Sequence, residues 1–218
     1  MLVGEWMLKD VTTVTEDVSM HKAGRIMQQR GVRRLPVVDG EGRLTGIVTE
    51  RDIKAASPSK ATSLDIYEMT QLLSQIKVRD IMTPKPLRIR PGGTVERAAA
   101  VMRDNKVGGL PVVDEDDRVV GVITDTDIFR LFTMISGVDR GGVQLAAVLP
   151  VEQGHLKQLI DDLRGLDAKI VSMLSHLNAS DEKKRTVYIR LRPMTEADEY
   201  RIRDHIQSRH QLLYWVKD

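Results

Sequence analysis

The chain has 218 residues, 41% of them hydrophobic, which is enough for two globular units with cores of their own. Its formal net charge of +2 is too small to favour nucleic acid or an acidic membrane surface, and the lack of cysteine excludes disulfides and thiol chemistry. No apolar run approaches ~18 residues, and the first residues lack the pattern of a signal peptide. We therefore expect a soluble, cytoplasmic protein with no nucleic-acid partner and no membrane insertion.

The first part of the chain predicts the order strand, helix, strand, strand, helix. Alternation, helical spacing and turn residues place these elements as follows: a weak strand at 10–15, a helix carrying Val18, Ala23, Ile26 and Met27, strands at 35–38 and 44–48 around a tight turn at 39–42, and a helix from Thr49 to near Pro58.

This part of the chain repeats after 75 residues. GIVTERD at 46–52 returns as GVITDTD at 121–127, and LPVVD at 35–39 returns unchanged at 110–114. One register holds between the two copies without a gap. Because a single supersecondary repeat cannot bury its apolar face alone, we expect the two copies to pack together.

The segment between the copies predicts a helix over 61–77, with an apolar face from Ile66 to Ile76. The glycine-containing stretch 137–142 predicts a linker. The remainder predicts a ferredoxin-like βαββαβ order, in which two helices cover one face of a four-stranded sheet. Its expected elements are strands at 143–149, 168–177, 187–191 and 212–216, helices from Leu156 to Gly165 and from Thr195 to Arg209, and a polar turn at 178–184.

The doubled motif T-x-x-D, Thr49 to Asp52 and Thr124 to Asp127, has two compatible interpretations. The first is a capping box, in which the threonine hydroxyl and the carboxylate satisfy backbone N–H groups at the start of a helix. The second is a nucleoside site, in which the carboxylate accepts from ribose hydroxyls, amides at the helix start meet phosphate, and apolar neighbours hold a purine.

The two copies resemble tandem CBS domains, the paired arrangement called a Bateman module. The LPVVD strand, the turn and the G-h-h-T-x-x-D motif carry this resemblance, which covers roughly residues 1–135. The middle segment and the trailing part are similar to the bacterial acetoin utilization proteins, in which an ACT-like domain follows two CBS domains. The implied fold class is α+β, with these parts: CBS domain 1 at 1–60, a linker helix at 61–77, CBS domain 2 at 78–136, a linker at 137–142 and an ACT-like ferredoxin-fold domain at 143–218.

The resemblance implies two adenine-nucleotide clefts between the repeats. The first cleft would use these residues: Thr124 and Asp127 for ribose, Val32 and Val122 for adenine, Thr12 on the first strand, and Arg33 and Arg34 for phosphate, where a solvated strand end is the alternative. The second cleft would use these: Thr49, Asp52, Ile47, Leu87 and Val107, with Gly108 and Gly109 in place of the arginine pair and Arg51, or a residue from across the cleft, for phosphate. We expect the cleft with Thr124 and Asp127 to bind nucleotide better.

In the ACT-like part, the family's glycine loop is matched by Gly154 and Leu156, whereas Val151 and Gln153 depart from it. Dimerisation is therefore the expected role of this domain. The five histidines are scattered, and no P-loop or nucleophile-elbow motif is present, so we expect neither a catalytic nor a metal site.

The expected function is that of a non-catalytic regulatory protein. It would sense an adenine nucleotide or a related adenosyl ligand, require no cofactor, form a homodimer and signal to a metabolic enzyme or transporter. Two alternatives stay open: a dimeric interaction scaffold with vestigial clefts, and an amino-acid sensor acting through the ACT-like domain. The sequence leaves open which nucleotide binds and whether both clefts are occupied.

Overall fold

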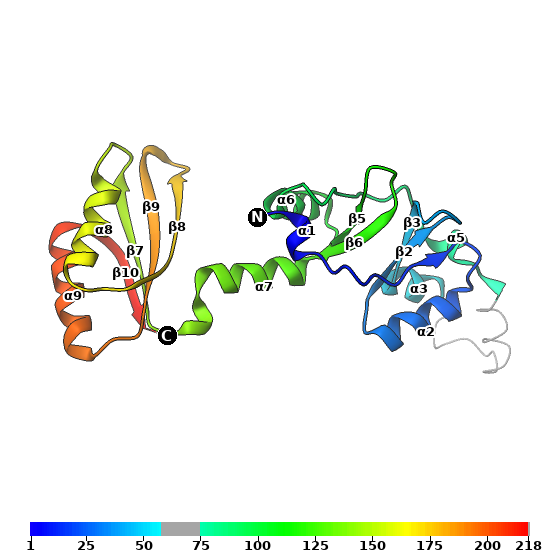
Figure 1. Cartoon of the computed structure of the whole chain (residues 1–218), viewed down its shortest axis with the longest axis horizontal. Coiled ribbons are helices and arrows are strands. Elements are labelled where there is room, and N and C mark those ends of the chain that lie inside the picture. The colour runs from blue at the N-terminus through cyan, green and yellow to red at the C-terminus, as the bar shows by residue number, and fades with distance from the viewer. Residues whose placement is uncertain (58–74, 218) are drawn as a thin grey trace. The chain divides into compact units, whose positions relative to one another are not determined.

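The computed structural model describes residues 1–57 and 75–217, which form two compact units, Met1–Ile128 and Phe129–Asp218 (Figure 1). We call them the N-terminal and the C-terminal unit. Most of the helix expected over 61–77 lies outside the described residues. Within the described ranges, no helix is long and apolar enough to cross a membrane. The division between the units falls inside a helix, α7 (Asp125–Ser136), ahead of the stretch 137–142 that the sequence predicts as the linker.

The N-terminal unit contains the two copies, each with the predicted order of elements. The first copy consists of α1 (Val3–Trp6), β1 (Val14–Thr15), α2 (Met20–Arg30), β2 (Arg34–Val38), β3 (Leu44–Thr49) and α3 (Glu50–Ala56). The second consists of α5 (Val78–Ile81), β4 (Thr83–Pro84), α6 (Val95–Asn105), β5 (Gly109–Val113), β6 (Val119–Thr124) and α7.

Two details of the first copy differ from the prediction. The strand expected at 10–15 is only Val14–Thr15, because β1 meets β2 through just these two residues. Val18 lies before α2, which begins after its N-cap Ser19, and packs its side chain against the core of this copy. The apolar spacing therefore located the buried face correctly but extended the helix too far toward the N-terminus.

The two copies share one hydrogen-bonding register. In the β2–β3 hairpin Leu35 pairs with Val48, and in the β5–β6 hairpin Leu110 pairs with Ile123, exactly 75 residues further on. Both hairpins contain a bulge at the same place. The parallel pair Val14 and Val37 likewise returns as an isolated bridge between Ile89 and Val112. The repeat in sequence is thus a repeat in structure.

Each copy completes the sheet of the other with the segment that precedes it. Leu8, ahead of the first copy, pairs with Val122 in β6, while Thr83, ahead of the second copy, pairs with Ile47 in β3. The backbone N–H of Val3 donates to the carbonyl of Gly93 at 2.8 Å, and that of Val78 donates to the carbonyl of Val18 at 2.8 Å. This exchange ties the copies into one body, as expected for repeats that cannot fold alone.

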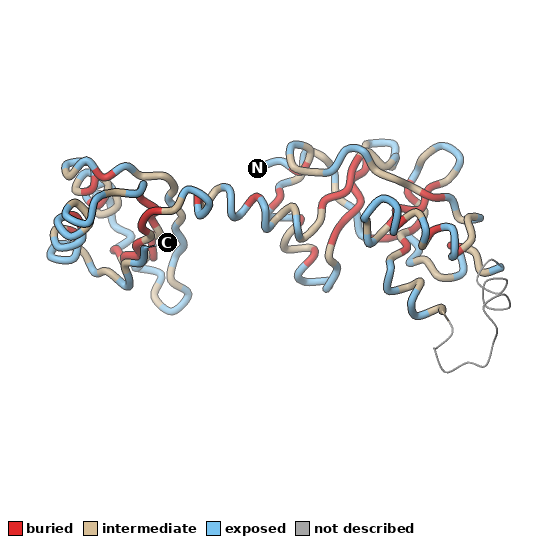
Figure 2. Tube along the Cα trace, turned by 90° about the horizontal axis from the view of Figure 1, so that it is seen from below, coloured by how far each residue is buried: buried red, intermediate tan, exposed pale blue. Residues whose placement is uncertain are grey.

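The hairpin turns and the cores extend the same symmetry. The N–H of Leu44 donates to the carbonyl of Asp117 at 2.9 Å, and that of Val119 donates to the carbonyl of Gly42 at 3.1 Å. The buried residues follow the strands and the inner helix faces, as Figure 2 shows. Equivalent core positions of the two copies are these: Ala23 and Ala98, Met27 and Met102, Leu35 and Leu110, Val37 and Val112, Val48 and Ile123, Val78 and Val3.

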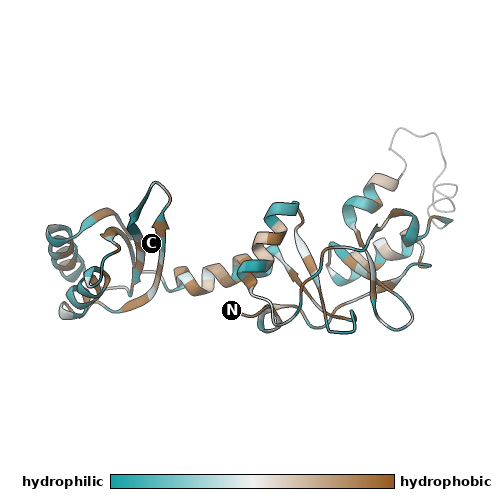
Figure 3. Ribbon diagram, turned by 90° about the horizontal axis from the view of Figure 1, so that it is seen from above, coloured by the Kyte–Doolittle hydropathy of each residue, from teal (hydrophilic) through white to brown (hydrophobic). Residues whose placement is uncertain are grey.

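The C-terminal unit has the predicted ferredoxin-like topology. After α7 and a short 3-10 turn (Val138–Arg140), its elements are β7 (Val143–Pro150), α8 (His155–Gly165), β8 (Ile170–Asn178), β9 (Asp181–Leu191), α9 (Glu196–Arg209) and β10 (Gln211–Lys217). The strands form an antiparallel sheet in the order β10-β7-β9-β8. The helices α8 and α9 pack on one face of it and turn hydrophilic residues outward (Figure 3).

The β8–β9 hairpin corrects the polar turn expected at 178–184. β8 continues to Asn178 and β9 begins at Asp181, so the connection is only two residues long. The lysines at 183 and 184 lie on an exposed strand end, where charge is compatible with β structure because the side chains remain in water.

Candidate functional site

Both T-x-x-D motifs form a complete capping box where a strand ends and a helix begins. The N–H and the hydroxyl of Thr49 donate to Oδ2 of Asp52 at 2.8 and 2.7 Å, and the N–H of Asp52 donates to the Thr49 hydroxyl at 3.3 Å. Thr124 and Asp127 make the same three bonds at 2.9, 2.6 and 3.3 Å. The structural interpretation of the motif therefore holds in both copies.

The capping geometry leaves part of each carboxylate available. Every hydrogen bond that Asp52 and Asp127 accept from the described residues goes to Oδ2. A carboxylate has about four acceptor positions on its two oxygens, so Oδ1 can still accept from a ligand. Capping and ligand binding are thus compatible in the geometry as well as in principle.

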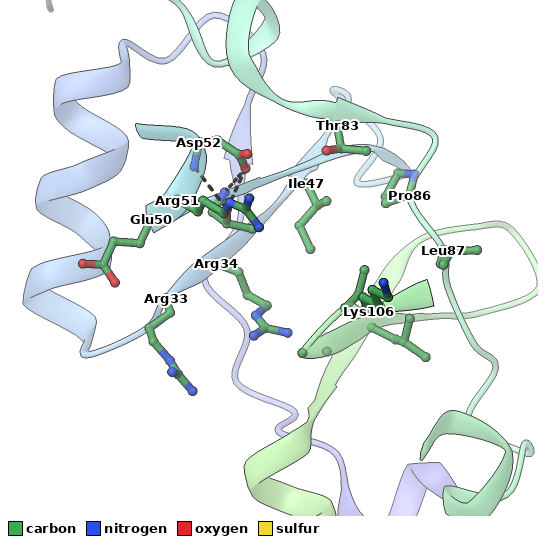
Figure 4. Close-up of a pocket in the computed structure, with 15 residues that line it drawn as sticks. Arg33, Arg34, Ile47, Glu50, Arg51, Asp52, Thr83, Pro86, Leu87 and Lys106 are labelled. Atoms are coloured by element: carbon green, nitrogen blue, oxygen red, sulfur yellow. Dashed lines mark hydrogen bonds between the residues drawn. The ribbon is translucent and has the colours of Figure 1, made fainter. Parts of the chain in front are cut away.

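A pocket of about 560 Å³ lies beside the first of these motifs, and we call it the Thr49 pocket (Figure 4). Its volume is within the range that small-molecule sites occupy. Both copies contribute to its wall. Nine of its lining residues were predicted from the sequence, namely Arg33, Arg34, Ile47, Thr49, Arg51, Asp52, Leu87, Val107 and Gly108; the others are Glu50, Thr83, Pro86, Lys106, Gly109 and Leu110.

The wall of the Thr49 pocket combines apolar and cationic side chains. Ile47 from β3 faces Leu87 and Val107 of the second copy, and these two are 44% and 37% exposed, so they are accessible to a ligand. Four cations, Arg33, Arg34, Arg51 and Lys106, outnumber the two acids of the lining, Glu50 and Asp52. The pocket can therefore hold a flat apolar group next to an anionic one.

The structure places Arg33 and Arg34 on the wall of the Thr49 pocket, although the sequence assigned them to the cleft of Thr124 and Asp127. Arg34 also interacts electrostatically with the second motif. Burial lowers the pKa of Arg34 from its ordinary value, and Arg33 acts in the same direction, while Asp125 and Asp127 act to raise it. The phosphate argument that favoured the cleft of Thr124 therefore applies to the Thr49 pocket too.

Gly108 and Gly109 give the arginines their space. A side chain at Gly109 would collide with the Arg34 guanidinium, and one at Gly108 would lie 3.0 Å from it. The repeat register aligns these two glycines with Arg33 and Arg34 themselves. One copy thus supplies two long cations, and the other supplies the room for them.

Lys106 is the pocket residue that the sequence analysis missed. It ends α6 in a left-handed conformation with φ 54°, where the first copy has Gly31 with φ 63°. A residue with a Cβ is strained in this conformation, and glycine is the usual choice after a helix. The available signal was the mismatch between Lys106 and Gly31 in the repeat, which places a lysine where the backbone favours glycine.

The residues assigned to the first cleft occupy the positions that the repeat makes equivalent to those of the Thr49 pocket. Thr12 is half-buried and precedes β1 rather than lying on it. Val32 packs partly against the core of its own copy, and Val122 is 7% exposed beside Leu8. Shifting by 75 residues gives these pairs: Leu87 and Thr12, Val107 and Val32, Ile47 and Val122, Thr49 and Thr124, Asp52 and Asp127.

Comparison with known proteins identifies the repeated unit. The CBS domain model matches residues 3–59 and 78–133, and so covers both copies of the motif. The chain belongs to the CBS-domain family. Within the described residues, no group of three or more His, Cys, Asp or Glu side chains is arranged to hold a metal ion.

Curated relatives share the CBS pair in different contexts. A CBS domain-containing protein of Dictyostelium discoideum is 34% identical over 135 residues, which are 62% of this chain and 93% of that protein. The homoserine O-acetyltransferase of Methanohalobium evestigatum is 33% identical over 129 residues, but these cover 59% of this chain and only 24% of the enzyme. The match to such enzymes is confined to their CBS part, so it does not extend to their chemistry.

Solved structures of CBS pairs have the same fold. The CBS pair of protein MJ0100, in complex with 5′-methylthioadenosine and S-adenosyl-L-methionine, is 31% identical and covers 62% of this chain and 97% of its own, with a TM-score of 0.52. CBSX2 of Arabidopsis thaliana in complex with AMP is 28% identical over 62% of this chain and 97% of its own, with a TM-score of 0.53. A Vibrio cholerae protein described as an acetoin utilization protein (AcuB) is 26% identical over 64% of this chain and 95% of its own, also with a TM-score of 0.53.

Proposed function

We propose that this protein is a non-catalytic regulatory sensor that binds an adenine nucleotide or a related adenosyl ligand in the Thr49 pocket. The observation that carries this proposal is the combination of a ribose-compatible carboxylate, Asp52, an apolar clamp and four cations on one wall. The adenosyl ligands of the similar structures, methylthioadenosine, S-adenosylmethionine and AMP, support the choice of ligand class.

In this proposal each chemical part of the ligand has its own contact. The purine lies between Ile47 and Val107, the ribose hydroxyls donate to Oδ1 of Asp52, and the phosphate is held by Arg34 and Arg51. A guanidinium can bind phosphate in bidentate geometry, which makes arginine suited to this position. The equivalent cleft of Thr124 and Asp127 is proposed as a second, related site.

The ligand would act by bridging the two copies. Thr49 and Asp52 belong to the first copy, whereas Leu87 and Val107 belong to the second. A ligand that touches both stabilises the arrangement in which both walls are in reach, and it shifts the population only by that difference in affinity. The signal would pass to the C-terminal unit, which we propose acts as an ACT-like dimerisation domain, and from there to a metabolic enzyme or transporter.

The capping boxes favour one alternative, in which the clefts are vestigial and the protein is a dimeric scaffold. Both motifs already have a structural role, so their recurrence alone does not require a ligand. The two proposals differ in what loss of the Asp52 carboxylate should do. A scaffold loses helix stability only, whereas a sensor also loses affinity for the ligand.

The test is calorimetric titration of the whole chain with AMP, ADP, ATP, S-adenosylmethionine, methylthioadenosine and adenosine. Asp52→Ala is compared with Asp198→Ala, because Thr195 and Asp198 form the same kind of hydroxyl–carboxylate cap on α9 in the other unit. Each variant should lose about 1 kcal/mol of stability. Only Asp52→Ala should lose nucleotide affinity, and Asp127→Ala reports on the second cleft in the same way.

Thermal unfolding gives an independent readout. A ligand at one hundred times its Kd should stabilise the folded protein by about 2.7 kcal/mol. If no adenosyl compound raises the melting temperature at millimolar concentration, the sensor proposal fails and the scaffold alternative stands.

A further inference from the structure

The C-terminal unit contains a second pocket, of about 530 Å³, on the sheet face opposite α8 and α9. We call it the sheet pocket. Side chains alternate along each strand, so Leu145 and Ile189 face the helices and enter the core, while Gln144 and Tyr188 face the other way into the pocket. The pocket is thus separate from the Thr49 pocket, and an argument about its ligand does not rest on the proposed function.

The end of α7 forms a roof that is bonded to the sheet. The carbonyl of Ser136 accepts from the hydroxyl of Ser172 at 2.7 Å and from Nε of Arg190 at 3.1 Å. Gly137 follows with φ 69°, and a Cβ there would lie 2.5 Å from the Val171 side chain, so the chain passes close to β8. Because two hydrogen bonds and a glycine turn hold the roof, the pocket is built into the unit.

The floor of the sheet pocket is an aromatic platform. Tyr214, Ala146 and Tyr188 are directly opposite one another on β10, β7 and β9. The ring centroids of the two tyrosines are 6.5 Å apart, and His176 stacks on Tyr188 at 5.8 Å. Ala146 is fully buried between the tyrosines, and its small side chain leaves room for the rings above it. Such a platform favours a flat ring as ligand.

The polar groups of the pocket favour an acceptor or an anion. None of the residues that line it is acidic, and it includes the cation Arg190, which is only 4% exposed. Arg190 keeps its bond to Ser136 and contributes positive charge to the pocket, whatever its other contacts are. Within the described part of the chain, the Gln144 amide and the Tyr214 hydroxyl donate to no other residue, so both can donate to a ligand.

We propose that the sheet pocket binds a small planar aromatic carboxylate, with its ring on Tyr188 and Tyr214 and its carboxylate toward Gln144 and Arg190. An amino acid fits less well, because the pocket has no carboxylate to meet an ammonium group. Phe132 on the roof is 56% exposed and can close over the ring. The ligand would thereby join the end of α7 to the sheet of the C-terminal unit.

The test is titration of the full chain with benzoate, 4-hydroxybenzoate and phenylacetate, followed by saturation-transfer NMR and calorimetry. Cyclohexanecarboxylate has the charge without the aromatic ring, and benzylamine has the ring with the opposite charge. We expect saturable binding of the aromatic acids, with both comparison compounds at least about 10-fold weaker, since aromatic contacts contribute up to ~1.5 kcal/mol each.

Variants locate the binding. Tyr188→Leu should weaken it about 10-fold or more, whereas Tyr200→Leu, an exposed tyrosine on α9 outside the pocket, should leave it unchanged. AMP titration of the same variants shows that the N-terminal unit is intact. The proposal is overturned if no aromatic acid binds saturably, or if Tyr188→Leu has no effect. It is equally overturned if Tyr188→Leu changes only the sedimentation coefficient, because the face is then a contact between copies of the chain.

Discussion

The guanidinium of Arg34 occupies the space in which a side chain at Gly109 would have to lie. The two residues are equivalent in the repeat, 75 positions apart, and face each other across the Thr49 pocket. Two identical copies could not make this contact, since two arginines would repel and two glycines would leave a gap. The difference between the copies at these positions therefore shapes the pocket, while the rest of the repeat builds its frame.

Gly109→Ala should displace Arg34 with little loss of stability. The added methyl group meets the end of a flexible side chain, which can turn away, and the carbonyl of Ile123 at 3.0 Å, so the cost is about 1 kcal/mol. Loss of one charge-assisted bond should weaken AMP binding about 10-fold, with a smaller effect on adenosine. Calorimetry with both ligands measures this difference. Gly92→Ala, which meets nothing within 4 Å, is the control.

Lys106→Gly should change stability and affinity in opposite directions. Glycine relieves the left-handed strain at the end of α6, so the free energy of unfolding should rise by about 0.5–1 kcal/mol. The loss of a cation from the Thr49 pocket should at the same time lower the affinity for AMP relative to adenosine. Urea unfolding and calorimetry on the same preparation provide both values.

Lys85→Gly is the matched control for this change. Lys85 also has a positive φ, 48°, and does not line the pocket. It should gain stability in the same way and leave nucleotide affinity as it was. Equal AMP affinity in the Lys106→Gly variant and the unmodified protein would show that Lys106 does not contact the phosphate.

Gly46→Ala should destabilise the N-terminal unit through Met82. A Cβ at Gly46 would collide with the thioether of Met82, and Gly121 has the same relationship to Met7, 75 residues earlier in each case. These glycines recur because each copy's β-hairpin packs against the segment that leads into the other copy. We expect a loss of about 1–3 kcal/mol in chemical unfolding.

A double-mutant cycle with Met82→Ala tests the cause. If the collision is the cause, the second substitution removes it, and the two effects should fall short of additivity by about 1 kcal/mol. Gly40→Ala, with nothing within 4 Å, should be nearly neutral. Strict additivity would place the cost of Gly46→Ala in the backbone instead.

The sequence predicted most of the fold because its signals are local or repeated. The alternation in β7 and the spacing in α6 follow from which face of each element is buried. The exchange of leading segments was not predictable, since Leu8 and Val122 meet only once the whole unit has folded.

The site shows the same limit. The T-x-x-D motif and the apolar wall could be predicted residue by residue. Which cleft Arg33 and Arg34 reach depends on the path of two long side chains over Gly108 and Gly109, and no local pattern encodes that path. The strained lysine at 106 was hidden because helix spacing does not report the conformation of the residue that follows the helix.

The acid stability of the C-terminal unit should depend on Asp162. This carboxylate on α8 accepts from Nε2 of His210 at 2.8 Å and from Nε of Arg209 at 3.1 Å, and so joins α8 to the end of α9. Its side chain is 14% exposed. Burial acts to raise the pKa of Asp162, but the hydrogen bond from His210 and the charge and hydrogen bond of Arg209 outweigh it, so the pKa lies below the ordinary 3.8.

The sign of the pH effect follows from that direction. Because the folded state holds the carboxylate ionised more strongly than the unfolded chain does, Asp162 contributes stability above pH 3.8, and this contribution is lost as the pH falls through its lower folded value. Asp162→Asn should therefore cost about 1 kcal/mol at pH 7, and the difference from the unmodified protein should shrink below pH 4.

The measurement is urea unfolding between pH 7 and pH 3 in a Trp6→Phe background, in which Trp215, packed against the core of the C-terminal unit, is the remaining tryptophan. Asp161→Asn, one residue earlier and exposed, changes the formal charge by the same amount without touching the α8–α9 contact. A difference for Asp162→Asn that stays constant down to pH 3, or one that Asp161→Asn reproduces, would assign the effect to general charge. A difference that is specific to Asp162 and disappears in acid would show that its bonds to Arg209 and His210 hold the two helices together.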